Sequence, residues 1–218
     1  MKVHAVSGMV TLALPPVGVL IRRGERHLAR VDPVMKRLIG RHGHCPLAER
    51  ELQPFHTLAN AIISQQLSSK AAAAIKQRLA ALIEGPLVPE KFLLLTAEQL
   101  RAAGLSQAKA RYLAALAGSV CARELLFDEI TLHEDEAIIE RLTQCPGIGR
   151  WTAEMFLIFG LKRLDVLAIG DAGLQRAARL FYGKQRRSKT LLSRVAQAWR
   201  PYRSVASWYL WRSLEDDP

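Results

Sequence analysis

Apolar residues recur along this chain at the three- and four-residue intervals of α-helices, and no strand-like alternation persists beyond the N-terminus. The clearest run falls on one helical face at spacings of i, i+3, i+4, i+7 and i+8: Phe55, Leu58, Ala59, Ile62 and Ile63. A polar turn from Ser64 to Ser69, broken by Leu67, separates this run from a second one over Ala72 to Leu82. The pattern predicts an all-α fold.

Capping residues set several further helix boundaries. Asp32-Pro33 predicts a helix that runs to about Arg41, because proline is favoured at the first helical position. The polar, glycine-containing segment 42–53 reads as a loop. We expect the remaining helices over about 96–104, from Ser106 to Val120, over 136–143 and 151–161, from Asp171 to Phe181, over 191–199, and from Pro201 through Trp211.

The length and the helix pattern suggest two closely packed helical lobes with a cleft between them. A chain of 218 residues is long enough to bury a sizeable core. We expect residues 51–164 to form one lobe, and residues 1–50, an N-terminal arm and helix, to pack with 165–218 as the other. Asp171 then lies at the mouth of the cleft.

The stretch from Leu142 to Gly160, LTQCPGIGRWTAEMFLIFG, combines two predicted helices with the turn PGIG. Gly147 and Gly149, close to Pro146, end the first helix and form a tight hairpin. Their bare N–H groups beside the start of the next helix are suited to holding a phosphate. An ordinary helix–turn–helix corner is the alternative interpretation.

Asp171 is the most informative carboxylate in the sequence. It follows the segment DVLAIG and stands at the predicted start of a helix. An aspartate at that position stabilises its helix by about 1 kcal/mol, so capping alone would account for it. Asp165, the other carboxylate of this region, we expect to have a structural role.

The charge and the cysteine content indicate which partners, metal sites and cellular compartment to expect. The formal net charge is +11, and nine basic residues and no acidic residue lie between Leu174 and Tyr209, which favours a polyanionic partner such as DNA. Cys45, Cys121 and Cys145 lack CxxC spacing, which argues against a zinc or iron–sulfur site and favours a reducing compartment. The apolar run within residues 1–21 is interrupted by Pro15-Pro16, so we expect no membrane association and a cytoplasmic protein, associated with the nucleoid if it is bacterial.

Four stretches together resemble one protein family. The segment CPGIGRWTAEMFLIFGLKRLDVLAIGDAGLQRA resembles the helix–hairpin–helix base-excision DNA glycosylases. PFHTLANAIISQQLSSKAAAAI, LRAAGLSQAKARYLAALA and WRPYRSVASWYLW are similar to one branch, the DNA-3-methyladenine glycosylase II group. The similarity extends from about Asp32 to Trp211, without the large N-terminal β-domain of some members.

The resemblance implies roles for individual residues. Asp171 matches the catalytic aspartate. Trp151, Met155 and Trp211 match the pocket for the flipped base, and Met155 departs from a tyrosine found in some relatives, which leaves the pocket's shape open. Gln66 and Leu67 match the wedge that fills the gap in the DNA. Gly147, Gly149 and Thr152 match the phosphate-binding residues, and the backbone carbonyls of Thr143, Cys145 and Ile148 match ligands of an alkali cation, Na⁺ or K⁺.

The implied activity is the hydrolysis of the N-glycosidic bond of alkylated purines in double-stranded DNA by a monomer that needs no cofactor. Relatives that also cut the backbone carry a lysine two residues after the second hairpin glycine, and this chain has Trp151 there. The resemblance therefore implies a monofunctional enzyme. A glycosylase for oxidised or mismatched bases, and a non-enzymatic protein that binds damaged DNA, are the alternatives.

Overall fold

The structure is a computed structural model that describes residues 15–49, 51–83, 85–183 and 190–215. Within these ranges the chain is helical and contains no strand, which confirms the all-α prediction. The elements are α1 (Val17–Val31), α2 (Pro33–His42), the 3₁₀ turn η1 (Pro46–Ala48), α3 (Pro54–Ser64), α4 (Ser69–Ile83), α5 (Pro89–Leu93), α6 (Ala97–Ala102), α7 (Gln107–Cys121), α8 (Phe127–Ile130), α9 (Asp135–Thr143), α10 (Arg150–Met155), the π-helical turn η2 (Phe156–Gly160), α11 (Ala172–Tyr182), α12 (Leu191–Val195) and α13 (Arg203–Ser213).

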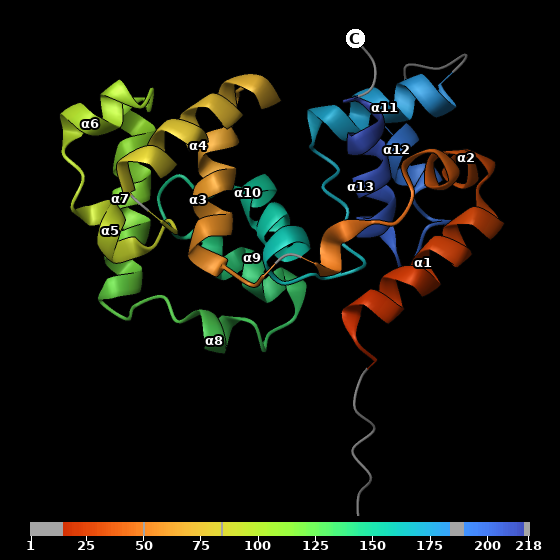
Figure 1. Cartoon of the computed structure of the whole chain (residues 1–218). Helices are drawn as coiled ribbons and strands as arrows, with labels where there is room; N and C mark the ends of the chain where they lie inside the picture. The colour runs from red at the N-terminus through yellow and green to blue at the C-terminus, as the bar shows by residue number, and fades with distance from the viewer. Residues whose placement is uncertain (1–14, 50, 84, 184–189, 216–218) are drawn as a thin grey trace, which may run out of the picture.

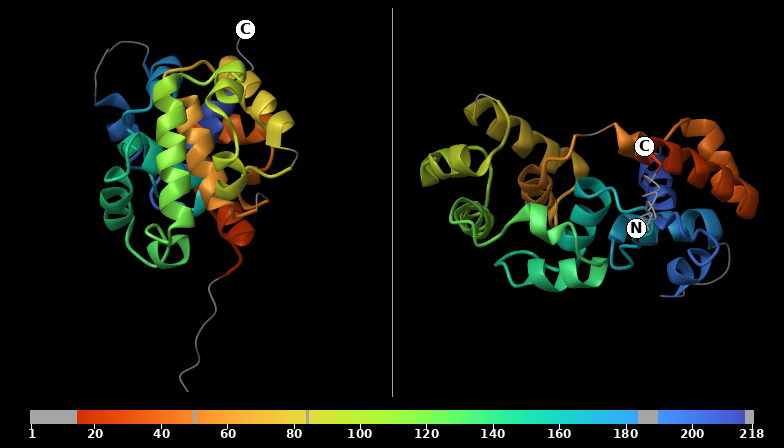
Figure 2. Two further views of the ribbon diagram at one scale, coloured as in Figure 1. Left: turned by 90° about the vertical axis from the view of Figure 1, so that its left-hand side faces the viewer. Right: turned by 90° about the horizontal axis from the view of Figure 1, so that it is seen from below.

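The helices gather into two groups (Figure 1). In one group α3 packs against α4, α7, α10 and η2, while α5 and α6 pack against α7 and α9 packs against α10. In the other group α1, α2 and α13 pack on one another, and α11 packs against α12 and α13. The right-hand view of Figure 2, seen from below, shows the same separation, with the chain crossing between the groups before α3 and after η2. The exact boundaries of the two lobes, between residues 50 and 51 and between residues 164 and 165, stay a prediction.

The capping predictions are confirmed where a side chain accepts hydrogen bonds from the first helical turn. Asp32 Oδ1 accepts from the N–H groups of Val34 and Met35 at 2.8 and 3.2 Å, and so starts α2. The other oxygen of Asp32 accepts from Trp199 Nε1 and from the Tyr182 hydroxyl, both at 2.8 Å. This buried carboxylate therefore ties α2 to the C-terminal helices.

The N-terminal region departs from the expected arm. Residues 1–14 lie outside the described part of the chain, but Val17–Val31 form α1, a helix that the sequence reading did not assign. Pro16 precedes the first helical residue, where it disturbs no hydrogen bond within the helix. Ile21, Gly24 and Leu28 form the buried face. Pro15-Pro16 thus marks the start of a helix and not a break in an arm.

The helix expected over 151–161 is split into two kinds of turn. After α10, the N–H of Leu161 donates to the carbonyl of Phe156 at 2.9 Å, a five-residue step typical of a π-turn. A Cβ on Gly160 would lie 2.8 Å from the Phe156 ring, so the glycine leaves room for that buried side chain. The loop expected over 42–53 likewise contains the short turn η1.

Candidate active site

Asp171 lies at the N-terminus of α11. Its Oδ1 accepts a hydrogen bond from the N–H of Leu174 at 2.7 Å, as the capping prediction required. The N–H of Asp171 itself donates to the carbonyl of Ala168 at 3.0 Å. The segment leading into it is fixed to the start of α13, because Asp165 forms an ion pair with Arg203 at 2.7 Å. Asp165 therefore has the structural role expected of it.

Two tryptophans from different helices converge on Asp171. Trp151 of α10 donates its indole N–H to Oδ2 at 2.7 Å, and Trp211 of α13 donates to Oδ1 at 2.9 Å. Asp171 is 8% exposed. A buried carboxylate is costly unless hydrogen bonds satisfy it, and the two indoles with the Leu174 amide supply three donors. The arrangement fixes the direction of both carboxylate oxygens.

Gly173 allows this close approach. A Cβ added there would lie 3.1 Å from Asp171 Oδ1 and 3.3 Å from Trp211 Cδ1. The indole of Trp211 also packs against the ring of Phe159, with centroids 5.6 Å apart. The indole therefore fits between η2 and the first turn of α11, and its N–H reaches the carboxylate.

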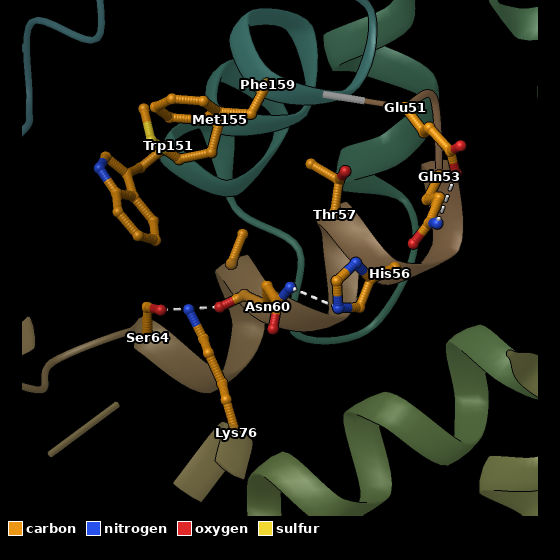
Figure 3. A pocket seen from close by; sticks show the side chains of 11 residues that line it. Glu51, Gln53, His56, Thr57, Asn60, Ser64, Lys76, Trp151, Met155 and Phe159 are labelled. Atoms are coloured by element: carbon orange, nitrogen blue, oxygen red, sulfur yellow. Dashed lines mark hydrogen bonds between the residues drawn. The ribbon is translucent and has the colours of Figure 1, made fainter. Parts of the chain in front are cut away.

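A pocket of about 560 Å³ lies beside this cluster (Figure 3). Trp151, Met155 and Phe159 form its apolar wall. The opposite wall is one face of α3 with Lys76 of α4, and Glu51 and Gln53 lie at one end; the α3 residues are His56, Thr57, Asn60, Ala61 and Ser64. Trp151 belongs to both the pocket and the Asp171 cluster. Trp211, the third expected pocket residue, contacts Asp171 and Phe159 and is not part of the pocket wall.

The polar wall was not predicted from the sequence. Asn60 Nδ2 lies 3.0 Å from His56 Nε2. Burial, together with the charge of Lys76, lowers the pKa of His56, which favours the neutral imidazole. The spacing of His56, Asn60 and Ser64, four residues apart on the face opposite the apolar run, was the available signal.

The hairpin glycines have different reasons to be glycine. Gly147 has φ +81° and faces the ring of Tyr112, whose Cγ would lie 2.2 Å from an added Cβ. Gly149 has φ −93°, and an added Cβ there would meet no atom within 4 Å. Gly147 is thus required by the fold, whereas the surface at Gly149 is open to a ligand.

The expectation that Thr152 binds phosphate is not supported by its position. The residue is 1% exposed, and its hydroxyl accepts a hydrogen bond from Gln65 Nε2 at 2.9 Å. With 1% of its surface accessible, Thr152 offers almost no surface to a DNA phosphate. Thr152 instead takes part in packing between α10 and the end of α3.

The expected wedge residues lie in the turn between α3 and α4. Gln66 has a left-handed backbone with φ +55°, and Leu67 is 40% exposed. Both side chains stand at the surface. This position leaves them free to contact DNA, and their role as the wedge stays a prediction.

A second buried carboxyl, Glu154, lies one turn after Arg150 on α10. It is 4% exposed and forms an ion pair with Arg150 Nε at 3.2 Å. Burial is the main cause that raises the pKa of Glu154, and the charge of Asp171 contributes. An acidic residue within an otherwise apolar helix was the signal that the sequence reading overlooked.

The part of the chain that is described shows neither a metal-binding cluster of side chains nor a membrane-spanning helix. No group of three or more His, Cys, Asp or Glu side chains there could hold a metal ion. No helix among those residues is long and apolar enough to cross a membrane. Thr143, Cys145 and Ile148 lie at the hairpin, where the carbonyl of Cys145 accepts from the N–H of Ile148 at 3.1 Å; the alkali-cation role of the three carbonyls stays a prediction.

Comparison with known proteins gives a consistent result. DNA-3-methyladenine glycosylase 1 of Schizosaccharomyces pombe is 34% identical over 199 residues, covering 88% of this chain and 87% of the relative. The structure of 3-methyladenine DNA glycosylase (Mag1) from that yeast in complex with abasic DNA matches with a TM-score of 0.74 and 32% identity, covering 88% of this chain and 97% of the other. A DNA-3-methyladenine glycosidase from Bacillus halodurans matches with a TM-score of 0.63 and 39% identity, covering 85% and 92%.

The family model described as HhH-GPD superfamily base excision DNA repair protein matches residues 59–201, which is more than half of the chain. This range contains the wedge turn, the hairpin, Trp151 and Asp171. The chain belongs to the HhH-GPD superfamily of base excision DNA repair proteins.

Proposed function

We propose that this protein is a monofunctional DNA glycosylase that removes alkylated purines, of the 3-methyladenine and 7-methylguanine type, from double-stranded DNA. The observation that carries the proposal is the convergence of Trp151 and Trp211 on the carboxylate of Asp171, beside a pocket with an aromatic wall. Relatives named DNA-3-methyladenine glycosylase, which match nearly the whole chain, support the same substrate class.

The first step is extrusion of the damaged nucleotide, because a base inside the duplex cannot be reached. Unstacking costs a few kcal/mol, least for a damaged base. Leu67 and Gln66 at the α3–α4 turn fill the space that the base leaves. The base then enters the pocket against Trp151 and Phe159, where a cationic alkylpurine gains about 0.5–2 kcal/mol from an aromatic face.

The chemical step is hydrolysis at the sugar C1′ atom. The bond between C1′ and the base nitrogen breaks, and its electron pair neutralises the positive charge of the alkylated base. Such a base leaves without a general acid, so one carboxylate suffices. The charge of Asp171, held by fixed N–H donors, stabilises the positive charge that develops on the sugar. A water oxygen then bonds to C1′ and gives up one proton to the solvent, which leaves an abasic strand with a hydroxyl group on C1′.

The activity ends at the abasic site because a lyase step needs an amine that attacks C1′. Trp151 occupies the position two residues after Gly149, and an indole has no basic amine. Lys162, the next lysine along the chain, donates its Nζ to the carbonyl of Ala48 at 3.2 Å. That hydrogen bond directs the amine toward the segment before α3.

We also propose that the hairpin holds both the DNA backbone and an alkali cation. The backbone at Gly147 and Gly149 anchors a DNA phosphate, and the carbonyls of Thr143, Cys145 and Ile148 bind Na⁺ or K⁺ at the hairpin. The protein acts as a monomer in the cytoplasm and needs no further cofactor.

The test is incubation with methylated duplex DNA and chromatographic identification of the released bases. We expect free 3-methyladenine and 7-methylguanine, and an abasic strand that breaks only after heat or alkali treatment. Borohydride should trap no covalent complex during turnover. A trapped complex, with strand breaks that appear as fast as base release, contradicts the monofunctional assignment.

A further inference from the structure

The turn between α3 and α4 is joined to the hairpin by hydrogen bonds between residues far apart in the sequence. Gln65 Nε2 donates to the carbonyl oxygen of Gly147 at 2.8 Å and to Thr152 Oγ1 at 2.9 Å. Gly147 belongs to the hairpin and Thr152 to the first turn of α10. One side-chain amide therefore connects the turn that carries Leu67 to the loop that carries the hairpin glycines.

Helix α7 contacts both the α3–α4 turn and the hairpin. Lys109 Nζ donates to the carbonyls of Ile63 and Gln65, each at 2.7 Å. Burial lowers the pKa of Lys109, and the two carbonyls offset part of its lost hydration. Tyr112 lies three residues further along the same helical face and packs its ring against Gly147. A single face of α7 thus contacts the end of α3 and the hairpin.

The turn held in this way has an unfavourable backbone. Gln66 adopts the left-handed region with φ +55°, which is disfavoured for a residue that carries a Cβ. Such a conformation persists where the surrounding contacts determine it, and it is common at functional sites. Gln65, the preceding residue, supplies those contacts: its side-chain amide donates to the carbonyl of Gly147, and its own carbonyl accepts from Lys109. They direct the exposed Gln66 and Leu67 outward.

We propose that Gln65 and Lys109 are positioning residues, a brace that holds the wedge turn (Gln66 and Leu67) at a fixed separation from the hairpin. The inference rests on the proposed function, since both segments must act on the same DNA. A duplex presents its phosphates and base steps at fixed spacing. With the turn already held in place, the protein can bind the DNA phosphates at the hairpin and insert the wedge between the DNA bases at the same time. The turn then needs no ordering during binding, which avoids an entropic cost.

The brace is tested with Gln65→Leu, which keeps similar bulk but removes both donors, and with Lys109→Met. A duplex containing a tetrahydrofuran abasic-site analogue serves as the probe, compared with the unmodified duplex and with the same single strand. We expect each variant to lose affinity for the abasic duplex by about tenfold or more, and to change little on single-stranded DNA, where there is no stack to fill. Excision of 7-methylguanine should show the same difference between duplex and single strand.

Lys162→Met is the control, because it makes the same substitution and removes a hydrogen bond from a lysine to a backbone carbonyl at a different place. It should leave the ratio of duplex to single-strand binding unchanged. Melting temperatures of all variants separate a general loss of stability from the loss of positioning. Equal losses on duplex and single strand, or unchanged affinity for the abasic duplex, would overturn the brace. Because binding needs no chemistry, a wild-type protein that released no alkylated base would refute the proposed function and leave this comparison intact.

Discussion

Replacing each indole by a phenyl ring separates two roles of the tryptophans at Asp171. Trp151→Phe keeps an aromatic face for the base, and Trp211→Phe keeps a ring beside Phe159, but each variant loses the N–H that holds the carboxylate. A hydrogen bond to a charged group contributes about 1.5–3 kcal/mol. If that energy orients Asp171 in the transition state, its loss slows the chemical step by about 10- to 150-fold, since 1.36 kcal/mol is a factor of ten.

The geometry ranks the two variants. When Trp211 is replaced, Asp171 Oδ1 still accepts a hydrogen bond from the Leu174 amide. When Trp151 is replaced, Asp171 Oδ2 loses the hydrogen bond that it accepts among the described residues. We therefore expect about tenfold slower chemistry for Trp211→Phe and about 100-fold for Trp151→Phe.

The assay is single-turnover release of 7-methylguanine from methylated duplex over a range of enzyme concentrations. The maximal rate should fall while the half-saturating concentration changes little. Trp151→Ala serves as the control, because it also loses the aromatic face of the pocket and should bind the lesion more weakly. Phenylalanine variants with the wild-type maximal rate would refute the positioning of Asp171 by indole N–H groups.

Three other predictions each concern a single position in the structure. Gly149→Ala should fold normally, since its Cβ meets no atom within 4 Å, but it should weaken binding to damaged and undamaged duplex about equally. Gly147→Ala should lower the melting temperature, because its Cβ overlaps the Tyr112 ring. Unchanged duplex affinity in Gly149→Ala would contradict the anchor. Burial raises the pKa of Glu154, so its carboxyl group stays protonated to a higher pH in the folded state than in the unfolded state. The folded state is therefore destabilised by Glu154 as the pH rises above about 4.5. The melting temperature of Glu154→Gln relative to wild type should therefore increase from pH 4 to pH 7, and a decrease would contradict the burial effect.

Features that depend on local sequence were predicted well. The caps at Asp32, Ser106 and Asp171 are confirmed, because each involves a side chain and an N–H two or three residues away. The apolar run from Phe55 to Ile63 is the buried face of α3 for the same reason. The missed helix α1 shows the limit of local reading, since Pro15-Pro16 is compatible with both a broken arm and a helix start.

Features that depend on distant contacts were not predicted. The sequence placed Thr152 at the start of a hairpin helix, where phosphate binding was a reasonable expectation. Its hydroxyl is instead bonded to Gln65, a residue 87 positions away. The resemblance assigned Asp171, Trp151 and Trp211 to one site, but the indole hydrogen bonds that join them depend on how α10, α11 and α13 pack.

The most direct test of the central claim compares wild type with Asp171→Asn in single-turnover excision from methylated duplex DNA. The amide keeps an oxygen for Leu174 and Trp211 but turns an NH₂ group toward the Trp151 N–H, so circular dichroism should first establish that the variant folds. The account predicts that base release falls by at least about 10²- to 10³-fold while binding to the duplex persists. Release of 3-methyladenine and 7-methylguanine by the folded variant at the wild-type rate would contradict it.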